Sequence, residues 1–526
     1  MLSSTSSEPV GATLESSPVA AEAAPAEKNT YGQILKSSVL VGGSSLLNIA
    51  IGIVRTKAMA VLLGPAGFGL FGLYGSISNL TQSIAGMGVN SSGVRQVAEA
   101  VGSNDLGRVA QTSTVLRRVS ILLGALGAVF LLVFARQVSI LTFGTDQNSA
   151  AIRLLSIAVF FTLVSAGQGA LIQGLRRISD LAKMNVLGAL FGTILTIPLV
   201  YWLRDQGVVP ALAGVAAVTL ITSWWFSRKV RIHHPSMTSS QVGHEAAELL
   251  KLGLAFMATG LMTMGSSYVV RIIVLRTLGF EATGMYQSAW TLGGLYVGFI
   301  LQAMGADFYP RLTASANDNP KCNRLVNEQT RVGLLLAGPG VIATLTFAPL
   351  IIAVLYSAKF AAAVGILRWI CLGATLQVIS WPMGFIIVAK NDRLIFLGSD
   401  LLWTVVHIGL AWTCVRYFGL NGTGMAFFGS YVFNLALIYA IVRRRTGFRW
   451  SRENIQTGML FLSLIGVTFC AFYLLPGLWT VGLGTVALAL SCVYSIRVLL
   501  TVIPWDQTPR AIQKLLMLGR PKLLVN

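Results

Sequence analysis

The sequence predicts an all-α protein that crosses a membrane many times. Of its 526 residues, 54% are hydrophobic and only 11% are charged, and the mean hydropathy is +0.72. Soluble domains typically carry about twice that share of charged residues. A chain this apolar is a polytopic membrane protein, and its spans are helices because a helix satisfies its own backbone hydrogen bonds inside lipid.

Apolar runs of roughly 20 residues, the length that crosses a bilayer core as a helix, recur along the whole chain. They lie at 34–63, 68–94, 115–135, 150–172, 181–203, 207–227, 247–278, 284–309, 330–355, 361–389, 394–415, 420–442, 457–475 and 478–500. The sequence therefore predicts about 14 transmembrane helices.

The basic residues predict the orientation of these spans. With the N-terminus in the cytoplasm, most of the 39 lysines and arginines fall in inside loops and tails, and few fall in outside loops. This distribution follows the positive-inside rule and predicts that both termini lie inside. The net charge of +20 is then a collar facing membrane lipids, and without an RNA or DNA module it does not indicate a nucleic-acid partner.

An internal repeat divides the chain. An offset of about 215 residues aligns 64–71 with 279–286, Phe134 with Phe347, Asn90 with Asp307 and, within one residue, Arg55 with Arg271. Because these matches occur in order, we expect two homologous six-helix lobes. An even number of spans per lobe keeps both lobes in the same orientation, which is a layout that places a substrate site between lobes near the bilayer midplane.

The predicted organisation follows from the repeat and from composition. The first residues are rich in Ser, Ala, Pro and Glu, which is typical of a disordered tail, and the last residues alternate basic and apolar side chains, which favours the membrane surface. The predicted segments are a cytoplasmic tail at 1–30, an N-lobe at 31–227, a cytoplasmic linker at 228–246, a C-lobe at 247–445, an additional helix pair at 446–503 and a basic interfacial tail at 504–526.

Four cations lie inside predicted spans, namely Arg55, Lys57, Arg271 and Arg368. Each costs about 2.5–3.5 kcal/mol at a helix centre, so they need a function or an escape. Arg55 shares a helix face with Asn48, seven residues earlier, whereas Lys57 lies about 200° around the helix from Arg55. We expect Arg55 and Arg271 to face a central water-filled cavity, while Lys57 and Arg368 have snorkelling to the membrane surface as an alternative.

Two arginines in a cavity favour an anion, because guanidinium groups fork onto phosphate oxygens. The candidate substrate-binding residues are Arg55, Lys57, Arg271, Asn48, Asn90 and Asp307. The amides suit sugar hydroxyls but could equally join helices, and Asp307 could instead be an interfacial residue. The five cysteines are scattered singly, and no metal-ligand pattern, phosphate-binding glycine loop or catalytic motif is present, so we expect no cofactor, no metal and no enzyme.

The run Arg55-x-Lys57-x-x-Ala60-x-x-Leu63-Gly64-Pro65-x-Gly67-x-Gly69 resembles the Wzx-type O-antigen and exopolysaccharide translocases, part of the multidrug/oligosaccharidyl-lipid/polysaccharide exporter superfamily. The resemblance covers about 31–445 and implies flipping of a polyprenyl-diphosphate-linked oligosaccharide from the inner to the outer leaflet of a bacterial inner membrane, without ATP hydrolysis. It also implies that a cationic central cavity receives the head group, with Arg55 and Arg271 in that role and Lys57 as the usual second cation. Further partners would be a polysaccharide polymerase and chain-length machinery, and the additional helix pair departs from relatives with twelve spans.

Two alternatives remain open at this stage. A cation-coupled multidrug antiporter of the same superfamily needs a buried carboxylate that loads a cation. A membrane enzyme such as a polysaccharide polymerase or ligase should have a large outer loop with acids, His or Arg, and the longest predicted outer loop, at about 136–150, is short.

Overall fold

The structure, a computed structural model, describes residues 30–103, 105–230 and 238–502. The elements within these ranges are helices joined by short connections, and no strand occurs among them, so the predicted all-α class is confirmed. The predicted tails at 1–30 and 504–526 and the centre of the predicted linker at 228–246 lie almost entirely outside the described residues.

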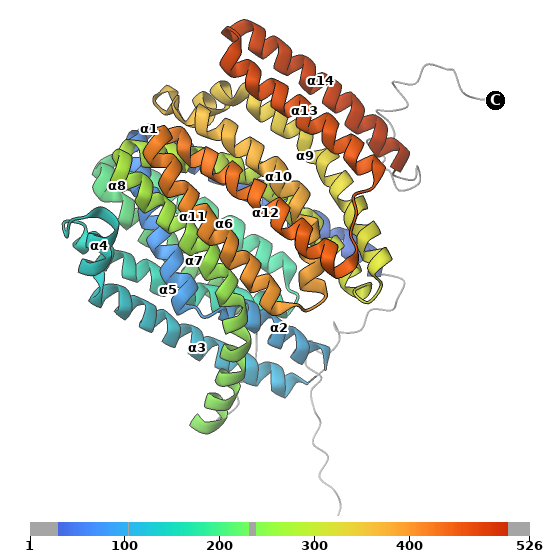
Figure 1. The fold of residues 1–526 in the computed structure, drawn as a ribbon. Coiled ribbons are helices and arrows are strands. Elements are labelled where there is room, and N and C mark those ends of the chain that lie inside the picture. The colour runs from blue at the N-terminus through green and yellow to red at the C-terminus, as the bar shows by residue number, and fades with distance from the viewer. Residues whose placement is uncertain (1–29, 104, 231–237, 503–526) are drawn as a thin grey trace, which may run out of the picture.

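The first half of the chain forms seven α-helices and one short 3₁₀ helix (Figure 1). In chain order they are α1 (Thr30–Ala85), α2 (Val89–Gly102), α3 (Leu106–Val133), α4 (Ala135–Phe143), α5 (Ser149–Gly174), α6 (Ile178–Leu203), η2 (Arg204–Gly207) and α7 (Val208–Ser227).

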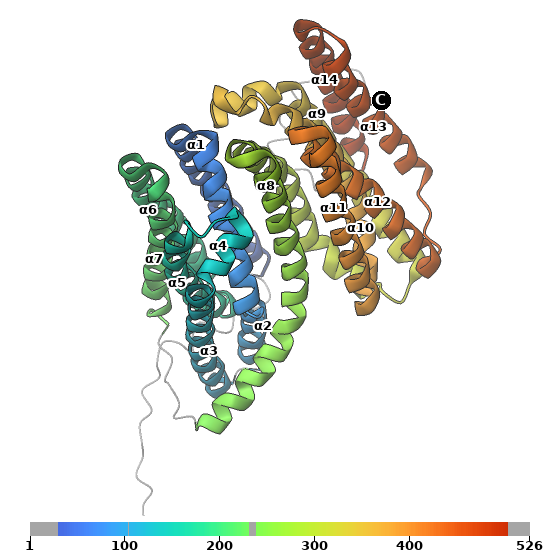
Figure 2. The ribbon, with the colours of Figure 1, turned by 60° about the vertical axis from the view of Figure 1, so that its left-hand side comes forward.

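The second half repeats this pattern with fewer short helices. Its elements are α8 (Ser239–Ala314), α9 (Asn319–Leu355), η3 (Ala358–Phe360), α10 (Ala363–Ala389), α11 (Arg393–Phe418), η4 (Gly419–Asn421) and α12 (Gly422–Thr446). Two further helices, α13 (Arg452–Leu474) and α14 (Gly477–Val502), pack on α9 at the edge of the molecule (Figure 2).

The two longest helices each bend at a glycine. Gly64 in α1 has φ 67° and ψ −173°, and Gly279 in α8 has φ 88° and ψ −176°. Glycine adopts this positive φ at no steric cost, so each site is a tight turn between two helical arms. We name these arms α1a (30–63), α1b (65–85), α8a (239–278) and α8b (280–314).

Other backbone features recur at the same spacing. The left-handed turn at Arg204, with φ 52° and ψ −131°, has its counterpart at Gly419, with φ 59° and ψ −136°. Asp105 and Asp318 cap α3 and α9 in the same way, each carboxylate accepting a hydrogen bond from the backbone three residues later. These paired conformations support the predicted repeat, whose lobe boundaries stay a prediction.

Ten helical stretches in the described part of the chain are long and apolar enough to cross a membrane. Four of them contain a break, at Gly64, at 204–207, at Gly279 and at 419–421, so the ten stretches can hold the predicted spans. The number of crossings and their orientation stay predictions.

Two differences from the predicted spans matter for the site. The span predicted at 68–94 ends at Ala85, because Met87 (φ 45°) and Gly88 (φ 66°) break the helix before the polar, amphipathic α2 begins. The predicted outer loop at 136–150 also contains a helix, α4, which ends at Gly144 with φ 84°.

The two halves meet along α1 and α8, which lie side by side in the middle of the molecule (Figure 2). Helices α3–α7 stand on one side of this pair, and α10–α12 stand on the other. We call the contact between α1 and α8 the seam. It is the natural place for a site shared by both halves.

Candidate functional site

The seam is closed by backbone contact near the two glycine turns. A Cβ atom on Gly69 of α1b would lie 2.5 Å from the carbonyl oxygen of Phe280, and one on Gly284 of α8b would lie 1.8 Å from the carbonyl oxygen of Pro65. Real Cβ atoms do not approach so closely. Glycine at both positions is therefore required for this contact between the halves.

Helix α4 of the first half strengthens the same end of the seam. Arg276 of α8a donates hydrogen bonds to the carbonyl oxygens of Leu141 at 3.0 Å and Thr142 at 3.2 Å, at the C-terminus of α4. The Tyr268 hydroxyl lies 2.5 Å from the Thr142 hydroxyl. A cation at a helix C-terminus satisfies the last carbonyls and the helix dipole, so Arg276 ties the halves together on the side predicted to face outward.

The opposite end of the seam is closed by a second glycine pair. A Cβ atom on Gly88 would lie 2.1 Å from the carbonyl oxygen of Gly253 in α8a, and one on Gly253 would lie 2.2 Å from the carbonyl oxygen of Met87. The seam between α1b and α8 is thus held at both ends, and a passage between the halves there requires these contacts to part.

A cavity of about 200 Å³ lies on the other flank of α1. It is bounded by α1a, α8b and the end of α9, and its walls are mostly apolar. Its lining residues are Ile49, Gly52, Ile53, Thr56, Thr291, Leu292, Leu295, Leu355 and Tyr356. The cavity adjoins the face of α1a next to Arg55, and neither Arg55 nor Arg271 is among its lining residues.

Arg271 is buried and donates hydrogen bonds within the second half. Its Nε donates to Gln287 Oε1 at 2.8 Å and its Nη1 donates to the Ser267 carbonyl oxygen at 2.9 Å. The guanidinium carbon lies 5.9 Å from the centre of the Tyr286 ring. None of these partners is anionic, so the positive charge of Arg271 is oriented but not neutralised.

Gln287 also connects Arg271 to the seam. A Cβ atom on Gly72 of α1b would lie 2.7 Å from Gln287 Oε1, the atom that accepts the Arg271 hydrogen bond. The absence of a side chain at Gly72 therefore makes room for this pair at the junction of α1b, α8a and α8b.

Arg55 lies in α1a with its guanidinium unengaged. It is partly buried, and no hydrogen bond or ion pair joins it to another described residue. Met59, one helical turn further and about 40° around the helix, is buried, whereas the exposed Val54 and Val61 lie roughly 100–120° around the helix from Arg55. The face that carries Arg55 thus points into the protein.

Asn48 continues the polar stripe below Arg55, and its Oδ1 atom is buried with no hydrogen-bond partner among the described residues. Arg55 precedes Gly64 by nine residues and Arg271 precedes Gly279 by eight, so the two arginines lie at matching depths, roughly 12–14 Å along the helix from their turns. Both arginines therefore lie within the protein at equivalent distances from their glycine turns. Arg271 has hydrogen-bond partners, and Arg55 has none among the described residues.

Lys57 has a different setting from Arg55. Its Nζ donates to the carbonyl oxygen of Val354, in the last turn of α9, so it acts as a C-terminal cap on that helix. Arg368, the other cation that could snorkel, lies with its guanidinium carbon 3.7 Å from the centre of the Phe472 ring in α13. Both cations have structural partners in the second half or the additional pair.

The remaining predicted site residues are not brought to Arg55 by any described contact. Asn90 is exposed on α2, beyond the break at Met87 and Gly88 that follows the end of α1b. The side chain of Asp307 lies outside those that the structure describes. Within the described residues, no group of three or more His, Cys, Asp or Glu side chains is placed to hold a metal ion.

Three further residues of the seam, namely Gln287, Gly72 and Arg276, were not assigned individual roles from the sequence. The glycine at position 72 is the repeat counterpart of Gln287, at the offset of 215, and that alignment is the one sequence signal that could have singled out the pair.

Two helical halves that meet at a seam, with cations inside long apolar helices, define a polytopic membrane protein. Solved structures agree. The lipid II flippase MurJ in an inward closed conformation is similar with a TM-score of 0.66 and 13% identity, covering 88% of this chain and all of that chain. A multidrug resistance MATE family transporter of the MOP superfamily, in an inward-facing conformation, is similar with a TM-score of 0.62 and 18% identity, covering 77% of this chain and 94% of that one.

A comparison with protein-family models identifies the family of this sequence. The family described as "Polysaccharide biosynthesis protein" matches residues 58–365, more than half of the chain, and this protein belongs to that family. The lipid III flippase of Escherichia coli (strain K12) is 22% identical over 421 residues, which cover 78% of this chain and 99% of the relative. The predicted resemblance to polysaccharide translocases is confirmed.

Proposed function

We propose that this protein flips a polyprenyl-diphosphate-linked oligosaccharide from the inner to the outer leaflet of the bacterial inner membrane, for O-antigen or exopolysaccharide assembly. Its family and the lipid III flippase relative support a lipid-linked substrate. In this proposal the protein is a transporter rather than an enzyme. A polysaccharide polymerase and chain-length machinery would use the delivered oligosaccharide.

The observation that carries the proposal is Arg55, an interior cation with no partner in the described structure. A free guanidinium at membrane depth is expensive unless an anion visits it. A diphosphate supplies two charges and several acceptor oxygens, which a guanidinium can bind in a forked geometry. Arg271, at the matching depth, adds a second positive charge that no carboxylate among the described residues neutralises.

Transport in this proposal proceeds by alternating access at the seam. The outer contact at Gly69 and Gly284 and the inner contact at Gly88 and Gly253 part in turn. The head group binds at Arg55 while the lipid tail stays in the bilayer. The charge of the diphosphate offsets the desolvation of Arg55, so binding favours the state in which the halves enclose the head group.

The test is the leaflet that holds the lipid-linked oligosaccharide in a strain lacking this protein, measured with an impermeant sugar probe on intact spheroplasts. The proposal expects accumulation on the inner leaflet, reversed by the wild-type protein and not by Arg55→Ala at equal abundance. Arg95→Ala is the matched control, because Arg95 is exposed and paired with Glu99. Normal outward delivery in the deletion strain would reject the flippase proposal.

One observation keeps the cation-coupled antiporter as a second candidate. The Oδ2 atom of Asp400 in α11 is buried without a hydrogen-bond partner among the described residues, as a carboxylate that loads a cation would be. The antiporter predicts drug sensitivity in a deletion strain with unchanged surface polysaccharide, and loss of drug resistance in Asp400→Asn. The flippase predicts the reverse for the surface polysaccharide.

A further inference from the structure

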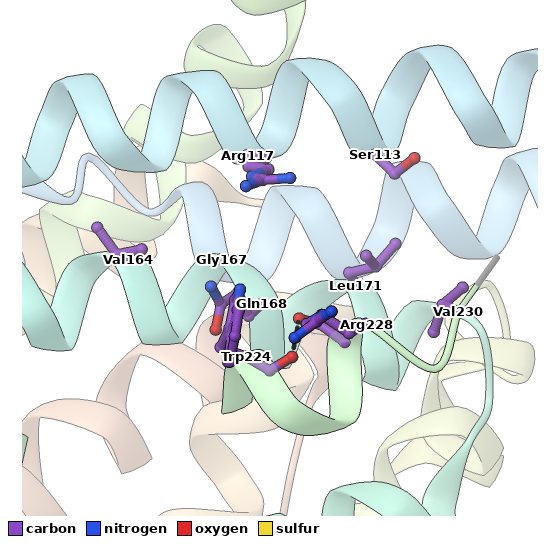
Figure 3. Close-up of a pocket in the computed structure, with 10 residues that line it drawn as sticks. Ser113, Arg117, Val164, Gly167, Gln168, Leu171, Trp224, Arg228 and Val230 are labelled. Carbon is purple, nitrogen blue, oxygen red and sulfur yellow. Dashed lines mark hydrogen bonds between the residues drawn. The ribbon is translucent and has the colours of Figure 1, made fainter. Parts of the chain in front are cut away.

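A second cavity lies away from the seam, within the first half. It measures about 230 Å³ and is lined by residues of α3, α5, α7 and the turn after α7. Figure 3 shows Arg117 on α3 at one side of the cavity and Arg228, from the end of α7, at the other side next to Gln168 and Trp224. No residue of the second half lines it, so this cavity is separate from the proposed transport site.

The surface around this cavity faces lipid. Leu122 on α3, together with Ile221 and Trp225 on α7, are large exposed hydrophobic residues. Arg228 directly follows the last residue of α7, a helix of 20 residues whose length, roughly 30 Å, equals one bilayer core. The cavity therefore opens at the boundary between hydrocarbon and head groups, on the side predicted to be cytoplasmic.

The cavity is cationic and has unused donors. Neither Arg117 nor Arg228 forms an ion pair with a described residue, and the Arg228 guanidinium carbon lies 4.4 Å from the centre of the Trp224 ring. The Ser223 hydroxyl donates to Gln168 Oε1 at 2.6 Å, which fixes the amide so that its NH₂ group remains available as a donor. Two guanidinium groups and an amide NH₂ are donors suited to one phosphate.

The volume of the cavity suits a lipid head group and is too small for a complete lipid. Sites that enclose a drug-sized molecule measure about 300–1,000 Å³, so a cavity of about 230 Å³ cannot enclose an oligosaccharide or a complete lipid. Val164 and Leu171 supply an apolar wall for the start of an acyl chain, and Trp224 is an aromatic residue at interfacial depth.

We infer that this cavity binds the phosphate of an anionic lipid in the inner leaflet, held between Arg117 and Arg228. Basic pockets between helices on the cytoplasmic side of a membrane are suited to such head groups. The phosphate has two possible sources, a membrane phospholipid such as phosphatidylglycerol or the polyprenyl diphosphate of a transport substrate. The inference does not depend on the proposed function, because the cavity and its charges are independent of the seam.

The experiment is native mass spectrometry of the full-length protein in detergent with phosphatidylglycerol, polyprenyl diphosphate or diacylglycerol added in separate samples. We expect the wild-type protein to retain at least one of the two anionic lipids and not diacylglycerol. In Arg117→Gln/Arg228→Gln the retained fraction of phosphatidylglycerol should fall by about tenfold or more, since one lost hydrogen bond to a charged group is worth roughly a factor of ten. The polyprenyl diphosphate samples are compared in the Arg55→Ala background, because the proposed transport site would also retain that lipid.

Arg118→Gln is the matched control, because Arg118 is exposed like Arg117 and is its neighbour in the chain but does not line the cavity. Equal retention by the double variant and the wild type, or an equal loss in Arg118→Gln, would overturn the inference, as would retention of neither anionic lipid by the wild type. Circular dichroism establishes that the variants are folded. Phosphatidylglycerol retention is measured without transport. Normal outward delivery in the deletion strain would therefore reject the proposed function and leave this inference standing, whereas loss of retention would reject this inference alone.

Discussion

Arg55 and Arg271 occupy equivalent places in the two halves, yet their surroundings differ. Arg271 is buried and donates to Gln287 and to the Ser267 carbonyl oxygen, whereas Arg55 has no partner in the described structure. The repeat explains the difference, because the position equivalent to Gln287 in the first half is Gly72, which has no side chain to offer. A repeated fold can thus hold one cation ready for a ligand and fix the other in place.

Arg55 and Arg271 are therefore expected to have different roles in the two halves. Hydrogen bonds to Gln287 and Ser267 partly offset the desolvation of the Arg271 guanidinium. The Arg55 guanidinium has no such partner until a ligand binds. Loss of Arg55 should therefore affect transport without harming the fold, and loss of Arg271 should affect both.

The largest expected effect is that of Arg55→Ala. Removing the unpartnered guanidinium should lower the rate of export by about 100-fold, since a forked arginine–phosphate contact is worth roughly 3 kcal/mol. Export is measured as outer-leaflet oligosaccharide per unit of protein, and thermal unfolding of the purified variant should match that of the wild type. A clear drop in Tm would show that Arg55 has a structural partner and would remove the contrast with Arg271.

Arg271→Ala should reduce export by roughly tenfold or more and should also destabilise the protein. Without the guanidinium, the partly buried Gln287 Oε1 loses its donor, which costs about 1–3 kcal/mol. Tm measured in detergent should fall by several degrees. Arg271→Ala/Gln287→Leu removes both polar partners and should regain stability without regaining export. Recovery of export in the double variant would contradict a role for the charge.

Gln287→Glu sharpens the same comparison through charge. A carboxylate at this position would form an ion pair with Arg271 and neutralise the second cation while leaving its geometry in place. We expect export to fall by about three- to tenfold with normal protein abundance, because the site then attracts a diphosphate less strongly. Gln82→Glu is the matched control, because it makes the same substitution in α1b, where Gln82 donates to Ser78 and has no hydrogen bond with Arg271. Unchanged export in Gln287→Glu would mean that the charge of Arg271 plays no part.

The smallest effect belongs to Lys57→Ala. Lys57 caps α9 by donating to the Val354 carbonyl oxygen, and an interaction of this kind contributes about 0.3–1 kcal/mol. Export should stay within about twofold of the wild type and Tm should fall slightly. A loss of export as deep as that of Arg55→Ala would place Lys57 in the substrate site after all.

Much of this architecture could be predicted from composition and periodicity. The apolar runs predict the helices because length and hydropathy alone decide whether a helix can cross a membrane. The offset of 215 predicts the paired turns at Gly64 and Gly279, since equal sequence at a turn gives equal backbone angles. The interior face of Arg55 follows from helical spacing to Asn48.

The rest depends on contacts between distant helices. Spacing on one helix separates Lys57 from Arg55 but cannot show that Lys57 reaches α9. The cross-half bonds of Arg276 and the pairing of Arg271 with Gln287 join segments whose approach is set by packing. The end of the second span at Ala85 was missed because Met87 and Gly88 adopt positive φ within a run that still looks apolar.

The most direct test of the central claim is the affinity of the purified protein for a short-chain polyprenyl-diphosphate oligosaccharide, compared between wild type, Arg55→Ala and Lys57→Ala at low and high salt. We expect Arg55→Ala to bind at least about tenfold more weakly and to lose part of the salt dependence, while Lys57→Ala binds like the wild type. Equal affinity of Arg55→Ala and the wild type would contradict the claim that this free cation receives the diphosphate.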